Sequence, residues 1–197
     1  MFKILINPFE KLQENQLLSI GVFAMLLGSF IGSALNARFD GFLDLHFTHH
    51  TGFSTVLLDN LINTTSSILL LFGLGRYINS KTRLIDIINT ILVSRIPFYL
   101  LPLFNLSGII SRASDLLIAL SQNQISVQDI PQFTFVFFMV FAFFTLIAIV
   151  WVITLLFNGF KTACNSKTTL HHIIFAIGIL LSEVISKTLI ILFNVAI

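Results

Sequence analysis

Ionisable side chains interrupt two long apolar segments of this sequence. Arg95 lies in the middle of one segment, and Glu183 and Lys187 lie in the second half of another. A charge at bilayer depth costs about 2.5 to 3.5 kcal/mol on insertion scales, so it usually faces a bundle interior and has a partner. If both segments start on one membrane side, Arg95 lies roughly 16 Å deep and Glu183 roughly 20 Å deep, at ~1.5 Å per residue. The matching depths predict an intramembrane charge network of Arg95, Glu183 and Lys187.

Such a network has two chemical interpretations. One is a buried ion pair that locks helix packing, which we favour, and the other is an ion or substrate path through the bundle. The segment "NLINTTSS" adds Asn60, Asn63 and Thr64, whose amide and hydroxyl groups suit hydrogen bonding between helices. These three side chains fit both interpretations, and we expect them in the bundle interior.

A histidine cluster in "LHFTHH" has the residue types of a metal site. A helix over residues 41–50 would put His46, His49 and His50 on one face, and Asp59 would be the best-placed carboxylate. Imidazole and carboxylate groups are ligands of zinc and copper. We favour a different interpretation, an interfacial loop helix with its histidines at the level of the lipid headgroups. The expectation is therefore no cofactor, with zinc or copper at this cluster as the alternative.

The overall composition defines the solvent in which these residues must be positioned. The 197 residues are 56% hydrophobic and only 10% charged, and they include 22 phenylalanines. A soluble domain has about 25% charged residues. There are too few polar side chains to cover a water-facing surface, so lipid must be the solvent for much of the chain.

Five apolar runs are each close to the ~20 residues that a helix needs to cross a bilayer. Helices are required because an open sheet edge cannot satisfy its hydrogen bonds in lipid. The sequence therefore predicts an all-α, polytopic membrane helix bundle, with residues 1–197 forming one membrane domain. The predicted spans are residues 17–34, 53–74, 84–106, 133–157 and 170–195.

Basic residues in the loops predict the orientation, because cytoplasmic loops collect Lys and Arg. The opposite loops hold only Arg38 and Arg112. We therefore expect the N-terminus inside and the C-terminus outside. The inside set is Lys3, Lys11, Arg76, Lys81, Arg83, Lys161 and Lys167.

Two further segments have the pattern of interfacial helices. In "NPFEKLQEN", Asn7 is a candidate N-cap, Pro8 suits the first helical position and Glu10 completes a capping box. On the other side, "SRASDLLIALSQNQISVQDIPQ" begins with Ser111 as a candidate cap, and its leucines share one face. Both helices are expected to lie on the membrane rather than cross it.

The third and fourth spans carry distinctive residues. Pro97 and Pro102 remove backbone donors, so the third span should kink after Arg95. The fourth span, "FTFVFFMVFAFF", has no polar anchor and is expected to face lipid or a partner. Trp151 is expected in its inner half, towards the interfacial belt.

The sequence lacks the motifs of the common enzyme classes. It has no GxSxG, no HExxH, no glycine-rich phosphate loop, and no span with two acidic residues at ligand spacing. The single Cys164 cannot form an internal disulfide, and the net charge of +2 gives no basis for nucleic-acid binding. We expect a protein that is not an enzyme and does not bind nucleic acid.

Short motifs near both ends resemble a known family. Asn7-Pro8 precedes the first span, Trp151 lies in the fourth, and Gly159-Phe160-Lys161 lies in the turn into the fifth. These features resemble the bacterial branch of the Yip-domain family of five-span membrane proteins. The resemblance implies a bacterial inner-membrane location and supplies no catalytic set. Eukaryotic members resemble traffic adaptors that bind small GTPases through a long N-terminal tail, which has no counterpart here.

Two functions from different classes follow. The first is a non-enzymatic membrane protein that packs with lipids, with a membrane-protein partner or with further copies of itself. The second is a small transporter or channel component that uses the polar interior around Arg95 and Glu183.

Overall fold

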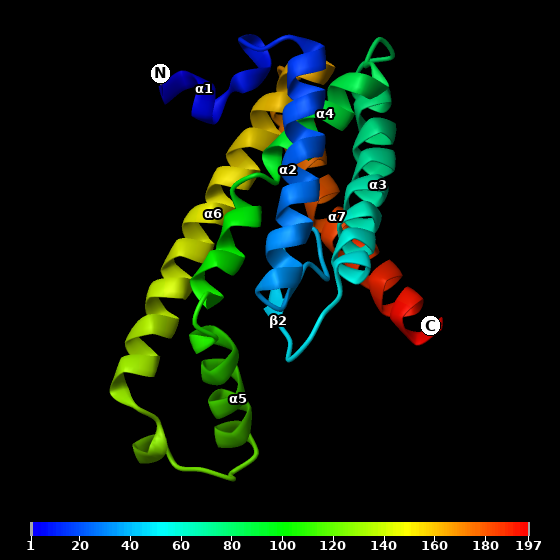
Figure 1. Ribbon diagram of the computed structural model, residues 1–197. Helices are drawn as coiled ribbons and strands as arrows, with labels where there is room; N and C mark the ends of the chain where they lie inside the picture. The colour runs from blue at the N-terminus through cyan, green and yellow to red at the C-terminus, as the bar shows by residue number, and fades with distance from the viewer. Residues whose placement is uncertain (1, 197) are drawn as a thin grey trace.

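The computed structural model describes residues 2–196, and most of them are helical (Figure 1). The predicted all-α fold is confirmed, with the addition of one short antiparallel ribbon in which Ala37 pairs with Phe47 and Arg38 with His46. The elements are α1 (Phe2–Ile6), η1 (Pro8–Glu10), α2 (Glu14–Ala34), β1 (Ala37–Arg38), β2 (His46–Phe47), α3 (Phe53–Ile78), α4 (Leu84–Ser94), η2 (Phe98–Asn105), α5 (Ile109–Ser121), η3 (Val127–Asp129), α6 (Gln132–Cys164) and α7 (Thr169–Ala196), where η marks a 3-10 helix.

Five helical stretches are long and apolar enough to cross a membrane, and they coincide with the five predicted spans. This is the architecture of a multi-pass membrane protein. The third stretch combines α4 with η2, and the fourth is much longer than predicted. Their bounds are Glu14–Ala34, Phe53–Ile78, Leu84–Asn105, Gln132–Cys164 and Thr169–Phe193.

The third span occupies the centre of the bundle. In its most apolar part 72% of the residues are buried, against 11% in α6. It is in contact with α2, α3 and α6, and Ile87 and Ile91 are fully buried there. Arg95 therefore lies at the centre of the molecule, as its sequence position predicted.

The predicted kink of the third span takes the form of a change in helix type after Arg95. Pro97 has no N–H, so the carbonyl of Val93 accepts a hydrogen bond from Ile96 instead, at 3.2 Å. Regular α-helix ends at Ser94, and a 3-10 helix containing Pro102 follows. This break puts Arg95 at the junction between two helical segments.

Glycines on α2 allow this helix to lie close against the third span. A Cβ atom on Gly28 would lie 2.4 Å from Cγ of Tyr99, and one on Gly21 would lie 2.6 Å from Cβ of Leu92. Small residues of this kind let helix backbones approach closely in a membrane. The close approach keeps Tyr99 packed at the level of Arg95.

The N-terminal segment differs from its predicted form. It consists of α1 and η1, and the predicted capping box of Asn7 and Glu10 does not form, since the Asn7 side chain caps no backbone group. The capping box belongs instead to Gln13 and Gln16 at the start of α2. Only a single 3-10 turn, Pro8–Glu10, follows Asn7, so the helix that this capping box would start is not present.

Helix α5 and the first part of α6 extend beyond the other helices, at the bottom of Figure 1. α5 begins at Ile109, so the predicted start at Ser111 is wrong. The carboxamide oxygen of Asn105 accepts hydrogen bonds from the backbone N–H groups of Ile110 and Ser111, both at 3.1 Å. It satisfies the free donors at the start of the helix in place of an N-cap side chain.

Candidate functional site

The segment between α2 and α3 folds into the end of the bundle. We call residues 37–47 the plug, because Ala37, Phe39 and Phe42 are almost completely buried in the bundle. Asn36, just before the plug, has a left-handed backbone with a φ of 55°, and its carbonyl accepts a hydrogen bond from the backbone of Thr48 at 2.8 Å. Asn tolerates this conformation better than most residues. The two ends of the plug are thereby held side by side.

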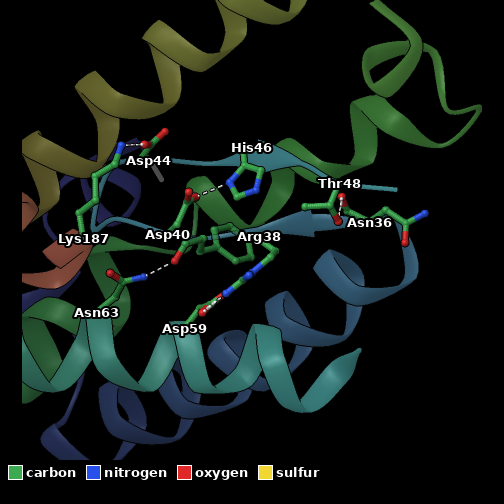
Figure 2. A network of polar contacts seen from close by, with 10 residues as sticks. Asn36, Arg38, Asp40, Asp44, His46, Thr48, Asp59, Asn63 and Lys187 are labelled. Atoms are coloured by element: carbon green, nitrogen blue, oxygen red, sulfur yellow. Dashed lines mark hydrogen bonds and ion pairs between the residues drawn. The ribbon is translucent and has the colours of Figure 1, made fainter. Parts of the chain in front are cut away.

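A buried ion pair fixes the plug to α3 (Figure 2). Arg38 donates two hydrogen bonds to Asp59, from Nε and Nη2, each at 2.8 Å. The hydrogen bond with Asp59 is the main reason that the pKa of Arg38 lies above its ordinary value. The side chain of Asn63, one turn further along α3, donates to the carbonyl of Phe39 at 2.6 Å.

Three contacts fix the other side of the plug to α7. The N–H of Leu43 donates to Oε2 of Glu183 at 2.6 Å, and the N–H of Phe42 donates to the hydroxyl of Ser186 at 3.1 Å. Lys187 pairs with Asp44. Helices α3 and α7, which pack directly against each other, therefore both hold the plug.

Glycine at position 41 is required for this close approach. A Cβ atom there would lie 2.1 Å from Oε1 of Glu183 and 2.9 Å from Cβ of Asp44. A larger residue would push the plug away from α7.

Asp40 and His46 pair across the plug. Their Oδ1 and Nδ1 atoms are 2.6 Å apart. Burial raises the pKa of Asp40, but the hydrogen bond with His46 and the charges of His46 and Lys187 lower it, and the net pKa lies below its ordinary value. The Asp40 carboxylate is therefore stabilised by the closed plug.

Arg95 lies beneath the plug, in an aromatic cage. The side chain is fully buried, and its Cζ lies 5.3 Å from the ring centre of Phe42, 5.4 Å from Tyr99 and 5.8 Å from Phe39. Cation–π attraction is worth roughly 2 kcal/mol or more at a desolvated site. Within residues 2–196, none of the three guanidinium nitrogens has a hydrogen-bond partner. Arg95 is thus held by rings, two of which belong to the plug.

Arg95, Glu183 and Lys187, the predicted network, are not joined by direct ion pairs, although Glu183 lies close enough to both cations to attract them. No carboxylate of the described chain lies within ion-pair distance of Arg95, because Glu183 accepts from the plug backbone and Lys187 pairs with Asp44. The depths of the helices were a good guide to position. The helix depths carried no information about the plug, whose backbone binds Glu183 and whose Asp44 pairs with Lys187.

The predicted polar interior of α3 is present, and its members bridge helices as expected. Asn60 donates to the hydroxyl of Ser29 on α2 at 2.9 Å, and Thr64 points its hydroxyl at the sulfur of Met25 at 3.8 Å. Asn63 donates its hydrogen bond to the plug, at the carbonyl of Phe39. The carboxamide oxygens of Asn60 and Asn63 have no partner in the part of the chain that the structure describes.

The predicted metal ligands are not brought together. Residues 46–47 form a strand rather than part of a helix, His46 is bound to Asp40, and Asp59 is bound to Arg38. His49 lies 3.7 Å from Asp115 of α5, and His50 is exposed. Across residues 2–196 no group of three His, Cys, Asp or Glu side chains is suited to hold a metal ion.

Sequence reasoning missed the residues that hold the plug in place, above all Arg38, Asp40 and Ser186. One signal was available: the stretch "ARFDGFLDLHF" combines charges, large apolar side chains and a glycine, which is unusual for a solvated loop. Comparison of the chain with protein-family models, with curated proteins and with solved structures finds no match.

Proposed function

We propose that this protein is a non-enzymatic, multi-pass protein of the Yip-domain type in a bacterial inner membrane, and that it acts by packing α6 against a membrane-protein partner, a second copy or lipid. The observation that carries the proposal is the surface of α6. This helix spans 33 residues, or about 50 Å at ~1.5 Å per residue, against the ~30 Å of a hydrocarbon core.

The free face of α6 supports the proposal through its composition. In the most apolar stretch of α6, only 11% of the residues are buried by the rest of the chain. Large apolar side chains follow one another along the exposed side, and α6 continues, together with α5, past the ends of the other helices (Figure 1). These side chains include Phe133, Val136, Met139, Phe143, Leu146 and Val150, all more than half exposed.

A photo-crosslinking amino acid on α6 tests the proposal. Phe143 and Val184 are both 61% exposed, on α6 and α7 respectively, so Val184 is a matched control. In native membranes, a probe at Phe143 should give a discrete protein adduct, identified by mass spectrometry as a partner or a second copy. A probe at Val184 should label lipid. Lipid labelling alone at both positions would rule out a protein partner on α6.

A second candidate function, transport of a small anion, is favoured by one observation. Arg95 is a buried cation with three unpartnered nitrogens in the described chain. A buried cation usually has an opposite charge nearby, and an anion would supply it. The plug would then close one end of the path.

Chloride efflux from proteoliposomes tests this second candidate. Efflux should exceed that of protein-free vesicles and should fall at least tenfold in Arg95→Gln, while Arg95→Lys should retain part of it. Efflux at the level of empty vesicles would reject an anion path and leave Arg95 as the anchor of the plug.

A further inference from the structure

A second polar site lies at the opposite end of the bundle from the plug. Between α2, α4 and α6 is a cavity of about 250 Å³, with Phe9 of η1 on its wall. Its charged residues are Glu14, Arg83 and Asp86, at the starts of α2 and α4. We call this cavity the end pocket.

The charges of the end pocket do not balance. Arg83 forms an ion pair with Glu14 and a longer one, at 3.9 Å, with Asp86. Two carboxylates therefore share one guanidinium, which leaves the pocket with an excess of one negative charge. The pocket thus has the electrostatics to receive a single cationic group.

Asn89 gives an independent indication of a ligand. It is 2% exposed, lines the end pocket, and donates from Nδ2 to the carbonyl of Glu14 at 3.1 Å. That bond fixes the orientation of the amide, because a carbonyl only accepts. The Oδ1 atom is left without a partner among residues 2–196. A buried acceptor of this kind calls for a donor.

The position of the end pocket indicates where the ligand comes from. Helix α2 and the third span, which begins with α4, start at the pocket and α6 ends there, so the pocket lies at the level of lipid headgroups. Exposed apolar residues of α1 lie on the same side, where Trp151 of α6 donates to the carbonyl of Leu5 at 2.7 Å. An indole at this level is typical of a membrane interface.

We propose that the end pocket binds a primary ammonium group, with Asp86 and Asn89 accepting its N–H donors. Phosphatidylethanolamine carries this group, and so does a free amine. A calcium ion fits less well, because Ca²⁺ takes about six to eight oxygen ligands, whereas the side chains of the pocket offer two carboxylates and the carboxamide of Asn89. The inference adds a defined headgroup to the proposed packing function, but it does not require a protein partner on α6.

Native mass spectrometry of the full-length protein tests the inference. The protein is mixed in turn with phosphatidylethanolamine, phosphatidylcholine and phosphatidylglycerol. We expect retention of phosphatidylethanolamine at least fivefold above the other two, since a choline headgroup has no N–H and a glycerol headgroup has no charge to match Asp86. Equal retention of the three lipids would overturn the inference.

Variants assign the binding to the end pocket. Asp86→Asn should lower phosphatidylethanolamine retention at least fivefold, whereas Asp129→Asn, which removes the same charge from an exposed loop, should leave it unchanged. Thr162→Trp fills the mouth of the pocket from an exposed position, so it should lower retention without loss of folding. Retention unchanged in both pocket variants would overturn the inference.

Competition with free ethanolamine distinguishes the two sources of the ammonium group. If millimolar ethanolamine displaces the lipid, the pocket recognises the amine itself. If it does not, the phosphate and acyl chains are also required, and the ligand is the lipid. Crosslinking at Phe143 reports on the partner of α6 independently, so failure of either proposal is seen separately.

Discussion

At the scale of single residues, the charges of this protein separate into buried and exposed pairs. The side chain of Asp59 is 3% exposed in its pair with Arg38, whereas those of Asp44 and Lys187 are 38% and 46% exposed. Removing one member of a buried pair usually costs about 3 to 5 kcal/mol. Exposed pairs contribute roughly 0 to 1 kcal/mol.

Asp59→Ala should therefore lower the midpoint of thermal unfolding strongly, and Asp44→Ala only slightly. The change at Asp59 removes the two hydrogen bonds that its carboxylate accepts from Arg38, in a pair that is largely buried. Unfolding in detergent, followed by Trp151 fluorescence, measures both variants. Equal effects would show that the plug is not held mainly through α3.

The Asp40–His46 pair makes the thermal stability depend on pH in the acidic range. A carboxyl with a depressed pKa adds stability above its unfolded pKa of about 3.9, and this stability is lost as the pH falls through the folded value. Thermal stability should therefore drop below about pH 4. Asp40→Asn should remove this part of the drop, and a pH profile identical to the parent's would contradict the assignment. Arg38 stays charged throughout, because its pKa is raised.

Residue types in the sequence predicted correctly that Arg95, Asn60 and Asn63 are buried, but they placed Lys187 inside the bundle as well, where its side chain is in fact 46% exposed. Asn60 and Asn63 could be assigned to the interior because amides within an apolar run need partners in lipid. The partners of Glu183 and Lys187 could not be assigned, because they lie about 140 residues away in a segment with no periodic pattern.

At the scale of elements, the plug contacts both α3 and α7, and Gly41 packs against the Glu183 side chain of α7 with no room for a Cβ atom. Gly41→Ala should displace the plug, since the added Cβ atom would overlap the carboxylate of Glu183. Gly52→Ala is a suitable control, because the nearest atom to its Cβ would be 3.8 Å away.

We expect Gly41→Ala to lower thermal stability and to speed hydrogen exchange at the N–H groups of Phe42 and Leu43, with Gly52→Ala close to the parent. Exchange by mass spectrometry reads the plug peptide directly. Unchanged exchange in Gly41→Ala would mean that Glu183 yields without displacing the plug.

The spans were predictable because length and hydropathy alone define a membrane helix. The plug was not, since a short segment that enters the bundle has the composition of neither a span nor a solvated loop. The helix boundaries near Pro8 and Asn105 also escaped prediction, because their capping groups come from positions outside the usual motifs.

At the scale of the whole molecule, the two ends of the bundle differ in character. One end holds the plug and the α5–α6 extension, and the other holds the end pocket and the N-terminal segment (Figure 1). The distribution of basic residues predicts that the end with the pocket faces the cytoplasm.

Cysteine labelling checks this orientation. Gln124→Cys should react with a membrane-impermeant maleimide in intact bacterial cells with a permeabilised outer membrane, and Lys81→Cys should react only after lysis. Both positions are exposed in the structure, and the native Cys164 is buried, so background labelling should be low. The reverse pattern would invert the predicted topology.

The contacts of the plug also set an order of events during biogenesis. Phe42 and Leu43 bond to groups of α7 that lie 144 and 140 residues later in the chain. Because α7 follows the third span in the chain, Arg95 is synthesised before the plug can be fastened to α7. The nascent protein thus passes through a stage in which the plug over Arg95 lacks its bonds to α7. Synthesis of α7 ends that stage, because it supplies the carboxylate of Glu183 and the hydroxyl of Ser186 that hold the backbone of the plug.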